Sequence, residues 1–558
     1  MRFRPDSQRT RLLVGPTAVA VIGFAVYLRT LMPGVSFGDW AEMQTVPHVL
    51  GIAHPTGYPT YILTAWLFEL LPVGSVAFRA NLLSAVLVAG TLATLAVITQ
   101  RLGVRPLIAA AAALALGAVG TVWAAATVAE VNPLHLFLMA LLVHRALVWT
   151  DERRPRDLVL CGLLLGLALG NHLLTLFVAP FLFAFAVWGG GRELWKRPVL
   201  LLAAALATIA GLAVYAYIPI AASQSPPLPY NHPTTLDSVL WLVSGTQFRG
   251  QFDFLSARGP GEFTAALPAL WNVFLSRSTP VLPVLGILGL VILVRARPAF
   301  GLACIAILLS GLYVWANYQQ LEHYLLVPFL VLGIGLAVAL EWGARAATWL
   351  VWQIAGRLRT AFTRAGRIGA GPVAGRIGAG PVVGLAGVAF AFALASTNFA
   401  AADRSGDRSG QDYVDSLFAA LPPNAAVLSY WDPSAPLWYG HFVEGLRPDI
   451  LIVDDTNIAY DGWGTVEARV ASLICERPVF VIRIGPQDLA PLRARWLVEK
   501  FMDIRISALG PSAAITQQVH RVQPKDATTC ATGMRDDGGR AAPEGFSATG
   551  GGSQNDPE

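Results

Sequence analysis

Two carboxylates stand close together near the start of the chain, in the segment GDWAEM. Asp39 and Glu42 are three residues apart, so their side chains share one face if the segment is helical. Such a pair can act as a general base with a helper, and as hard oxygen ligands the two acids can also hold Mg²⁺ or Mn²⁺. A structural interpretation stays open as well, in which Ser36 caps a short interfacial helix and the acids stabilise its first turn.

Further polar residues follow in the same part of the sequence. His54 and Tyr58 belong to the segment HPTGYP, whose two prolines and glycine predict a tight turn. Arg79 and Asn81 come at the outer end of the next apolar run, where a polar pair either reaches the membrane surface or lines a cavity. These residues are candidates for substrate binding, and a corner of the fold is the alternative explanation for the turn.

Apolar sequence surrounds these groups. The chain has 558 residues, of which 55% are hydrophobic and 13% charged, and its mean hydropathy is +0.55. This composition excludes a soluble domain of that size and indicates a lipid bilayer as the solvent. The net charge of +5 does not indicate nucleic-acid binding, because most arginines lie in short loops between apolar runs.

The apolar runs recur at about 17 to 25 residues, which suffices to cross roughly 30 Å of hydrocarbon as a helix. The first run is too long for a signal peptide and no cleavage site follows it, so a retained helix is expected. In total the pattern predicts about eleven transmembrane helices: Leu12–Met32, Val76–Gln100, Leu107–Ala126, Pro133–Trp149, Leu158–Gly170, Leu173–Trp188, Val199–Ala221, Pro280–Val294, Ala299–Ala316, Tyr324–Leu340 and Val382–Thr397.

The loops between these runs alternate in their content of arginine and lysine. The positive-inside rule assigns the basic set, with the N-terminus and the Gly-rich linker 356–381, to the cytoplasm. The opposite set is nearly free of basic residues and contains the two long polar loops, 33–75 and 222–279. We therefore expect these loops, and everything after Thr397, on the outer face of the cytoplasmic (inner) membrane.

The composition becomes that of a soluble domain after the last apolar run. Short apolar segments bounded by turn residues predict a small extracytoplasmic α/β domain over 399–525, following a transmembrane domain over 1–398. Its expected elements are strands at Ala426–Tyr430, Asp449–Val453 and Pro478–Ile484 and a helix at Pro436–Glu444.

The end of the chain adds two expectations. Residues 526–558 are rich in Gly, Ser, Asp and Pro without apolar periodicity, so a disordered tail is expected. Cys475 and Cys530 are the two cysteines in polar sequence, and in an oxidising compartment they can pair. The sequence leaves that pairing open.

Several blocks of the sequence, in this order, carry a family resemblance: GDWAEM, GIAHPTGYPTY, AFRANLLSA, YIPIAASQSPPLPYNHPTTLDSVLWLVSGTQF, NYQQLEHYLLVP and LPPNAAVLSYWDPSAPLWYGHFVEGLRPDILIVD. Together they resemble the protein O-mannosyltransferase-like transmembrane family over most of residues 30–455. That family is similar to the GT-C superfamily of multi-span glycosyltransferases. The resemblance implies a GT-C-like fold for the polytopic helical part of the chain.

The resemblance also implies an activity and roles for residues. It implies transfer of a sugar, mannose by the family pattern, from a polyprenyl-phosphate donor to Ser or Thr of exported proteins, and an envelope glycan would be an equally suitable acceptor. Asp39 matches the position of the catalytic acid, and the residues around it match the surrounding motif: Glu42, His54, Tyr58, Arg79 and Asn81. The stretch SQSPP lacks the arginine usual before the prolines, so Arg249 or Arg79 is the expected phosphate partner.

Residues of the later outer segments are further candidates for substrate contact. Tyr230, Asn231 and Gln247 either shape a sugar pocket or pack the second long loop, and Glu322 either contacts donor or acceptor or is a solvated acid. A divalent cation bridging Asp39 and the neighbouring acid is a possible cofactor.

Two other classes of function compete with an enzyme. A transporter or flippase of lipid-linked sugars should place charged groups or broken helices near the bilayer midplane in two related halves. The predicted helices have almost no ionisable residues in their middles, and the polar blocks gather at their outer ends. A non-catalytic envelope scaffold is the third class, and it predicts that changing Asp39 has no effect.

Overall fold

The computed structural model describes residues 11–191, 194, 196–248, 260–317, 321–364, 378–506, 515–526 and 530. Arg249, the candidate phosphate partner, lies outside the described residues. So do residues 365–377 of the basic linker and most of the 526–558 tail, for which the prediction of disorder stays a prediction.

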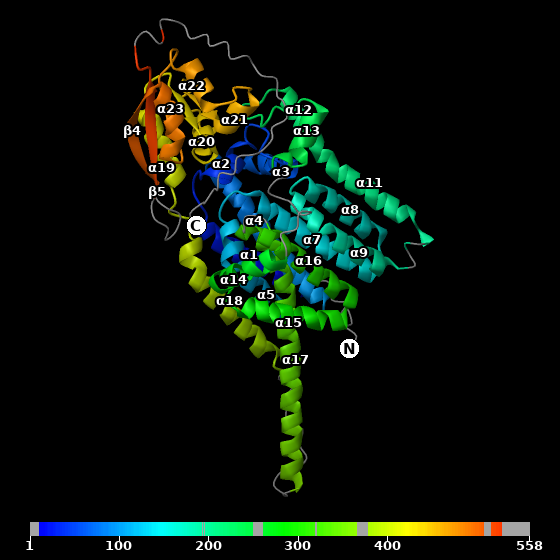
Figure 1. Ribbon diagram of the computed structural model, residues 1–558. Coiled ribbons are helices and arrows are strands. Elements are labelled where there is room, and N and C mark those ends of the chain that lie inside the picture. Colours follow the sequence, from blue (N-terminus) through cyan, green and yellow to red (C-terminus); the bar gives the residue numbers. More distant parts are fainter. Residues whose placement is uncertain are drawn as a thin grey trace.

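The chain is mostly helical through its first 400 residues (Figure 1). Within the described residues, six helices are long and apolar enough to cross a membrane, or seven if a bent pair counts as one span. The six are α4 (Val76–Arg101), α7 (Val131–Glu152), Val199–Ser223 with α11 and α12, α16 (Pro298–Asn317), Glu322–Ala355 with the 3₁₀ turn η4 (Glu322–Leu325) and the first part of α17 (Leu326–Arg364), and α18 (Gly380–Ala402). The predicted multi-span helical fold is therefore confirmed.

All eleven predicted runs fall on helices, but several of these helices are short. Three apolar helices have 10 to 17 residues: Gly15–Arg29 in α1 (Arg11–Arg29), α5 (Pro106–Gly117) and α9 (Ala179–Gly190). One predicted run is divided, because the chain leaves the helix at Val119 between α5 and α6 (Gly120–Ala125). The run Leu173–Trp188 is also divided, into the 3₁₀ turn η1 (Leu173–Phe177) and α9, and the run before it, Leu158–Gly170, falls on α8 (Pro155–Leu169).

The second long loop holds more helix than the sequence indicated. It contains α13 (Leu236–Val243) and α14 (Pro260–Ser278), and residues Thr264–Ser278 meet α15 (Val281–Ala296) at 105° as the bent pair. Leu270 and Phe274 of α14 are buried, whereas Trp271 and Leu275 are exposed. A helix that buries only one face has apolar and polar residues mixed along its sequence. It contains no continuous apolar run, and for this reason α14 was not predicted.

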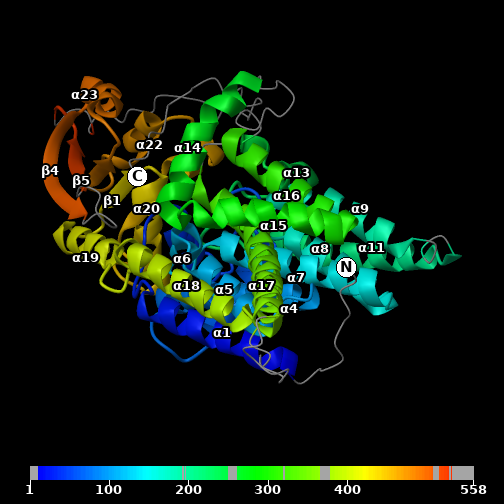
Figure 2. The same ribbon diagram turned by 90° about the horizontal axis from the view of Figure 1, so that it is seen from below.

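Helix α17 is also longer than predicted. Its 39 residues correspond to about 58 Å of helix, against roughly 30 Å of hydrocarbon. The end of α17 projects away from the other helices (Figure 1), and seen from below the helix points out of the middle of the helical part (Figure 2). The linker that the sequence predicted from residue 356 therefore begins as helix.

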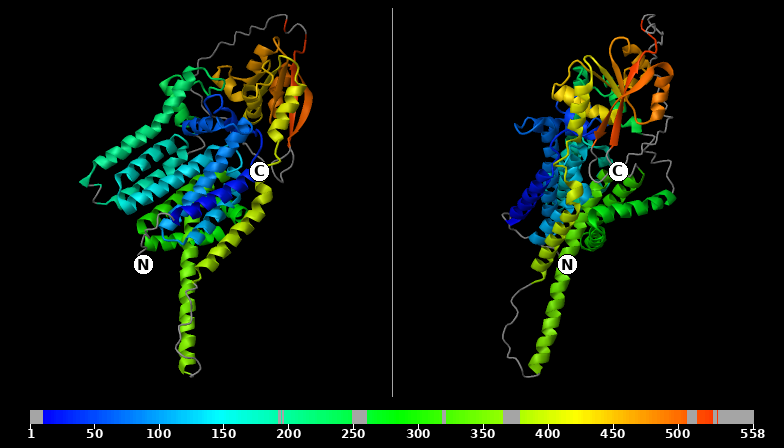
Figure 3. Two further views of the ribbon diagram at one scale, coloured as in Figure 1. Left: turned by 180° about the vertical axis from the view of Figure 1, so that it is seen from behind. Right: turned by 90° about the vertical axis from the view of Figure 1, so that its left-hand side faces the viewer.

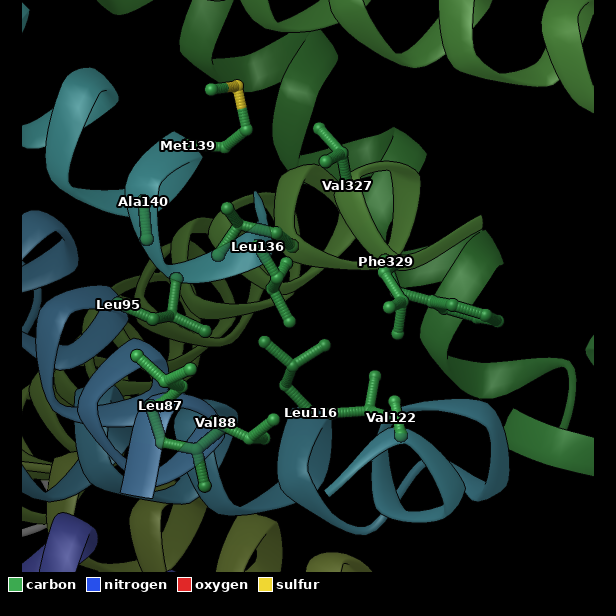
Figure 4. Close-up of a cluster of buried hydrophobic side chains, with 14 of the residues drawn as sticks. Leu87, Val88, Leu95, Leu116, Val122, Leu136, Met139, Ala140, Val327 and Phe329 are labelled. Carbon is green, nitrogen blue, oxygen red and sulfur yellow. The ribbon is translucent and has the colours of Figure 1, made fainter. Parts of the chain in front are cut away.

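A hydrophobic core joins the central helices α4, α5, α6, α7 and α17. Figure 4 shows its side chains interlocking between these helices, among them Leu87, Val88, Leu95, Leu116, Val122, Leu136, Met139, Ala140, Val327 and Phe329. Small residues allow the closest helix contacts, as expected in a membrane. A Cβ on Gly289 of α15 would lie 1.7 Å from the carbonyl oxygen of Gly335 in α17, so only glycine fits there.

The soluble part begins with α19 (Ser409–Ala420) and forms a five-stranded sheet in the order β2-β1-β3-β5-β4. The strands β1 (Ala426–Ser429), β2 (Leu451–Asp454) and β3 (Val479–Ile482) are parallel, and β5 (Ile515–Gln523) runs antiparallel to β3 and β4 (Leu497–Ile506). The sequence predicted these three parallel segments as strands without their pairing, and it did not predict β4 and β5. The predicted helix is present as α20 (Trp431–Trp438) and a π-helical turn, η5 (Tyr439–Val443).

Four more helical elements belong to the described part of this domain. They are α21 (Asp455–Tyr460), α22 (Val466–Leu473), η6 (Pro486–Leu489) and α23 (Ala490–Arg495). Apolar clusters cover the sheet, one with α19 and one with α21, α22 and α23. A disulfide joins Cys475 to Cys530, with 5.5 Å between the Cα atoms, so the pairing that the sequence left open is present.

The α/β domain lies against the first long loop, 33–75, at the end of the molecule opposite the projecting end of α17 (Figure 3). This loop contains α2 (Gly38–Thr45) and α3 (Pro59–Glu69). Phe37 packs on the domain core, with its ring centroid 5.3 Å from that of Tyr413. The Ala77 N–H donates to the Tyr439 hydroxyl at 3.1 Å. The two parts of the chain thus meet directly above the transmembrane helices.

Candidate functional site

Helix α2 positions the carboxylates of Asp39 and Glu42. The chain enters it through the extended Phe37 and through Gly38, whose φ of 51° favours glycine. Asp39 and Glu42 are one turn apart, as predicted, yet their surroundings differ sharply. The Asp39 side chain is 63% exposed, whereas that of Glu42 is 1% exposed.

The buried carboxylate is held by the HPTGYP turn. Glu42 Oε1 accepts a hydrogen bond from the backbone N–H of His54 at 2.8 Å, and Oε2 pairs with His54 Nδ1. On the far side of the imidazole ring, the Tyr58 hydroxyl lies 3.0 Å from Nε2, and it donates to the carbonyl of Pro55 at 2.9 Å. The turn predicted as a corner therefore wraps around Glu42 and orients the histidine ring.

Burial and charge act in opposite directions on this pair. Burial raises the pKa of the Glu42 carboxyl. Burial alone would lower the pKa of His54, but the charges of Glu42 and Asp39 outweigh it and raise that pKa to about 9. The two side chains therefore share one proton across the neutral range, and neither leaves the other as an uncompensated buried charge.

Asp39 lies beside this pair and faces the α/β domain. Its Oδ2 is 4.0 Å from His54 Nε2, and its Oδ1 accepts a hydrogen bond from Trp431 Nε1 at 2.9 Å. Trp431 is the first residue of α20, directly after the strand β1 and Tyr430. The acid that the sequence selected as a base is thus exposed at a junction between the membrane unit and the soluble domain.

The same three side chains fit a cation. One ligand atom each from Asp39, Glu42 and His54 lie within 4.8 Å of one another. Because His54 Nδ1 faces Glu42, its Nε2 is the ring atom turned toward Asp39, and a carboxylate behind a ligating imidazole is a common arrangement in metal sites. The donor set of oxygen and imidazole nitrogen suits Mn²⁺ better than Mg²⁺, which prefers oxygen alone.

Asn81 fixes the position of α2 from below. Its Oδ1 accepts from Gln44 Nε2 at 2.7 Å and from the Ala129 N–H at 2.8 Å, and its Nδ2 donates to the Met32 carbonyl at 2.9 Å. The Asn81 side chain is completely buried. The candidate binding residue therefore has a structural role, in which it joins α4, α2 and the ends of neighbouring helices.

Arg79 points elsewhere. Its Nη1 donates to the Gly74 carbonyl at 3.2 Å, at the start of its own helix. No hydrogen bond or ion pair among the described residues joins it to Asp39 or Glu42. The structure thus gives no support to Arg79 as a partner of the phosphate at this site.

Residues of the second long loop form a polar cluster next to the site. The hydroxyls of Tyr230 and Tyr460 both donate to Gln247 Oε1, at 2.7 and 2.9 Å. Burial raises the pKa of Tyr230, so its hydroxyl stays a donor. The Tyr230 ring centroid is 5.8 Å from that of Trp431. Asn231 occupies the left-handed region, with φ 55°, and contributes a turn.

Glu322 lies in a separate cluster. Arg277 Nε donates to both of its carboxylate oxygens, at 2.9 and 3.0 Å, and the Thr121 hydroxyl donates to Oε2 at 2.8 Å. This carboxylate joins α14, α6 and the turn η4 (Glu322–Leu325). It is held by an arginine, and no hydrogen bond or ion pair within the described part of the chain joins it to Asp39.

Trp431 and Tyr460 are the residues that sequence reasoning missed. Both belong to the soluble domain, for which the sequence predicted strands and a helix but no site residue. The charged Asp449 of that domain pairs with Arg447 at 2.9 Å and accepts a hydrogen bond from the Asn424 N–H. The position of Trp431 in the sequence could have identified it. It follows a parallel strand, and sheets with parallel strands bind ligands at the carboxyl ends of those strands.

Comparison with known proteins agrees with the resemblance found in the sequence. Residues 39–194 match the model of the protein O-mannosyl-transferase TMEM260 N-terminal domain. The chain is 27% identical to protein O-mannosyl-transferase TMEM260 of Mus musculus over 488 residues, which cover 83% of this chain and 65% of the mouse protein. It is 26% identical to the Dictyostelium discoideum protein of that name over 31% of this chain and 23% of that protein. The matches thus span less than two thirds of these relatives.

The fold has a counterpart among solved structures. ArnT from Cupriavidus metallidurans, solved bound to undecaprenyl phosphate, superposes with a TM-score of 0.52 at 16% identity, covering 92% of this chain and 98% of ArnT. ArnT in the apo state gives a TM-score of 0.51, with the same identity and coverage. The GT-C-like fold expected from the sequence is therefore confirmed.

Proposed function

We propose that this chain, whose residues 39–194 form a protein O-mannosyltransferase-like domain, is a membrane glycosyltransferase that takes a sugar from a polyprenyl-phosphate donor. The observation that carries the proposal is the arrangement at α2: an exposed Asp39 beside a buried, proton-sharing pair, at the place where the soluble domain meets the membrane unit. The relatives named protein O-mannosyl-transferase support mannose as the sugar.

Asp39 acts as the general base in this proposal. An acceptor hydroxyl loses its proton to the Asp39 carboxylate while its oxygen forms a bond to the anomeric carbon. The bond from that carbon to the phosphate oxygen breaks, and the polyprenyl phosphate leaves with the electron pair. A single displacement of this kind inverts the anomeric configuration. General-base assistance contributes typically about 10² to 10⁴ in rate.

The buried pair supports the base electrostatically. Glu42 carries the charge that keeps His54 protonated near neutral pH, so the imidazole presents its Nε2 side 4.0 Å from Asp39 as a positive group. A positive charge here orients the carboxylate and offsets the negative charge of the nearby donor phosphate. With a divalent cation bound, Asp39 and His54 would hold it, and the cation would supply that positive charge to the phosphate.

Two independent features support an outer location for the site. The Cys475–Cys530 disulfide lies in the α/β domain, and disulfides persist in oxidising compartments. The arginine-rich loops assign the opposite ends of the helices to the cytoplasm. The proposed enzyme therefore works on the outer face of the cytoplasmic membrane, where exported proteins offer Ser and Thr hydroxyls as acceptors and envelope glycans offer sugar hydroxyls.

The test uses purified protein with polyprenyl-phosphate mannose and an acceptor peptide rich in Ser and Thr. We expect transfer by the wild type and a loss of about 10² to 10⁴ in rate in Asp39→Asn, since asparagine keeps the shape of the side chain but accepts no proton. Donor binding should stay intact. Normal turnover in Asp39→Asn would exclude the proposal, and movement of donor across vesicles without transfer would favour a flippase.

A further inference from the structure

Trp431 connects the soluble domain to the proposed base. It is 392 residues away from Asp39 in the sequence, yet its Nε1–H donates to Asp39 Oδ1 at 2.9 Å. That atom is the indole's single hydrogen-bond donor. The other carboxylate oxygen, Oδ2, is the one turned toward His54, at 4.0 Å. The hydrogen bond from the α/β domain therefore makes the two oxygens of Asp39 different: Oδ1 is bound by Trp431, and Oδ2 faces His54.

The indole ring is itself held in place by other rings. Its centroid lies 5.8 Å from that of His54 at 86° and 5.8 Å from that of Tyr230 at 76°. On the domain side, the Trp438 ring packs at 5.2 Å and 81°. Edge-to-face contacts in this range are favourable and directional. The N–H group therefore points at Asp39 from a fixed ring.

We propose that Trp431 is a positioning residue: it holds the Asp39 carboxylate with Oδ2 toward His54, so that the α/β domain completes the active site. The inference rests on the proposed role of Asp39 as base. An exposed aspartate near the start of a helix can rotate among staggered side-chain conformers, and a misplacement of about 1 Å can cost about 10²-fold in rate. The indole bond selects one of these conformers.

Docking of the domain does not depend on this bond. Phe37 inserts into the domain core beside Tyr413, and the Ala77 N–H binds the Tyr439 hydroxyl. Gly38 lies so close to α20 that a Cβ on it would be 2.8 Å from Asp432 Oδ1. With these contacts in place, removal of the indole N–H leaves the domain attached and changes the orientation of Asp39.

The experiment compares three variants of the full-length protein. In Trp431→Phe the ring stays and the N–H is lost, so we expect kcat to fall by about 10-fold to 10²-fold with the donor KM changed less than about threefold. Trp431→His restores a ring N–H and should recover part of kcat. Trp438→Phe keeps an aromatic ring against Trp431 and serves as the packing control, so its loss of kcat should be smaller than that of Trp431→Phe.

The results separate this inference from the proposed function. Wild-type kcat in Trp431→Phe, with Asp39→Asn inactive, would overturn the positioning role and leave the base assignment intact. An active Asp39→Asn would instead remove the base assignment itself. Equal losses in Trp431→Phe and Trp438→Phe would show that packing of α20, and not the N–H bond, supports activity, which also overturns the inference. Incorporation of benzothienylalanine at position 431, which replaces the N–H by sulfur in a ring of the same shape, should reproduce the loss of Trp431→Phe.

Discussion

Two acids near the ends of apolar helices, Asp39 and Glu322, were both candidates for substrate contact, and the structure gives them opposite surroundings. Glu322 has both oxygens bound by Arg277, with a third bond from Thr121. Asp39 accepts a bond from the neutral Trp431 on one oxygen and is 63% exposed. A carboxylate neutralised by a bidentate arginine joins helices, whereas an exposed one beside a protonated histidine is available to take a proton.

The two acids also differ in their neighbours, because Asp39 has the buried Glu42 beside it. The contacts of Glu322 among the described residues are with Arg277 and Thr121 and include no buried acid, whereas Asp39 is one helical turn from Glu42, which is 1% exposed. A buried carboxylate is costly unless paired, and here the pairing with His54 also builds the charge that faces Asp39. The burial of Glu42 beside His54 thus gives Asp39 a positively charged neighbour, and the described residues contain no such buried pair beside Glu322.

Among the variants that test this difference between Asp39 and Glu322, we expect Glu42→Gln to have the largest effect on kcat after Asp39→Asn. A glutamine side chain at this position cannot carry the charge that raises the pKa of His54, so the imidazole becomes neutral near pH 7 and loses its effect on Asp39. We expect kcat to fall by about 10-fold to 10²-fold, a smaller loss than in Asp39→Asn. Steady-state transfer assays on the purified variant would measure it.

Glu42→Gln also distinguishes two roles of Asp39 and Glu42, as ligands of a bridging cation or as a general base with a buried helper. Equal and complete losses in Asp39→Asn and Glu42→Gln, partly restored by added Mn²⁺ or Mg²⁺, would favour a bridging cation. Loss of wild-type activity on treatment with EDTA, recovered by one of these ions, would point the same way. A graded loss without cation dependence supports the base with its buried helper.

The Glu42–His54 pair also predicts how stability depends on pH. The pKa of His54 is raised from 6.5 to about 9 in the folded protein, so the pair's contribution is fully present below about pH 6.5 and is lost as pH rises through about 9. We expect Tm in detergent to fall between about pH 7 and about pH 9.5 in the wild type, and to fall less in His54→Gln. Parallel declines in both proteins would contradict this.

The sequence predicted the parts of the site that local spacing determines. Asp39 and Glu42 are one helical turn apart because they are three residues apart on a helix, and HPTGYP forms a turn because of its prolines and glycine. Such relations depend on the 3.6-residue period and on turn residues alone. The contact of His54 with Glu42, 12 residues away, was not predicted. The three parallel strands were predictable for a related reason, since each is a short apolar run between turn residues.

Long-range contacts and helix rotation were not predictable from the sequence. The bond from Trp431 to Asp39 spans 392 residues, and only the docking of the α/β domain creates it. Arg79 lies in the first turn of α4, but the rotation of that helix turns its guanidinium to the Gly74 carbonyl. Arg277, the partner of Glu322, belongs to α14, and the sequence predicted this helix as part of a loop.

Glu322→Gln tests the structural side of the comparison and has the smallest expected effect on activity. The amide keeps the size of the carboxylate but loses the charge that binds Arg277, whose guanidinium is 39% exposed and can turn to water. We expect kcat within about twofold of the wild type and a loss of stability of roughly 1 to 3 kcal/mol, as for hydrogen bonds to charged groups, visible as a lower Tm. Arg277→Gln should give a similar Tm, and the double variant should add little, because both changes remove one shared interaction. A fall in kcat as large as that of Glu42→Gln, with unchanged Tm, would show that Glu322 belongs to the substrate site, and would contradict the distinction drawn between the two acids.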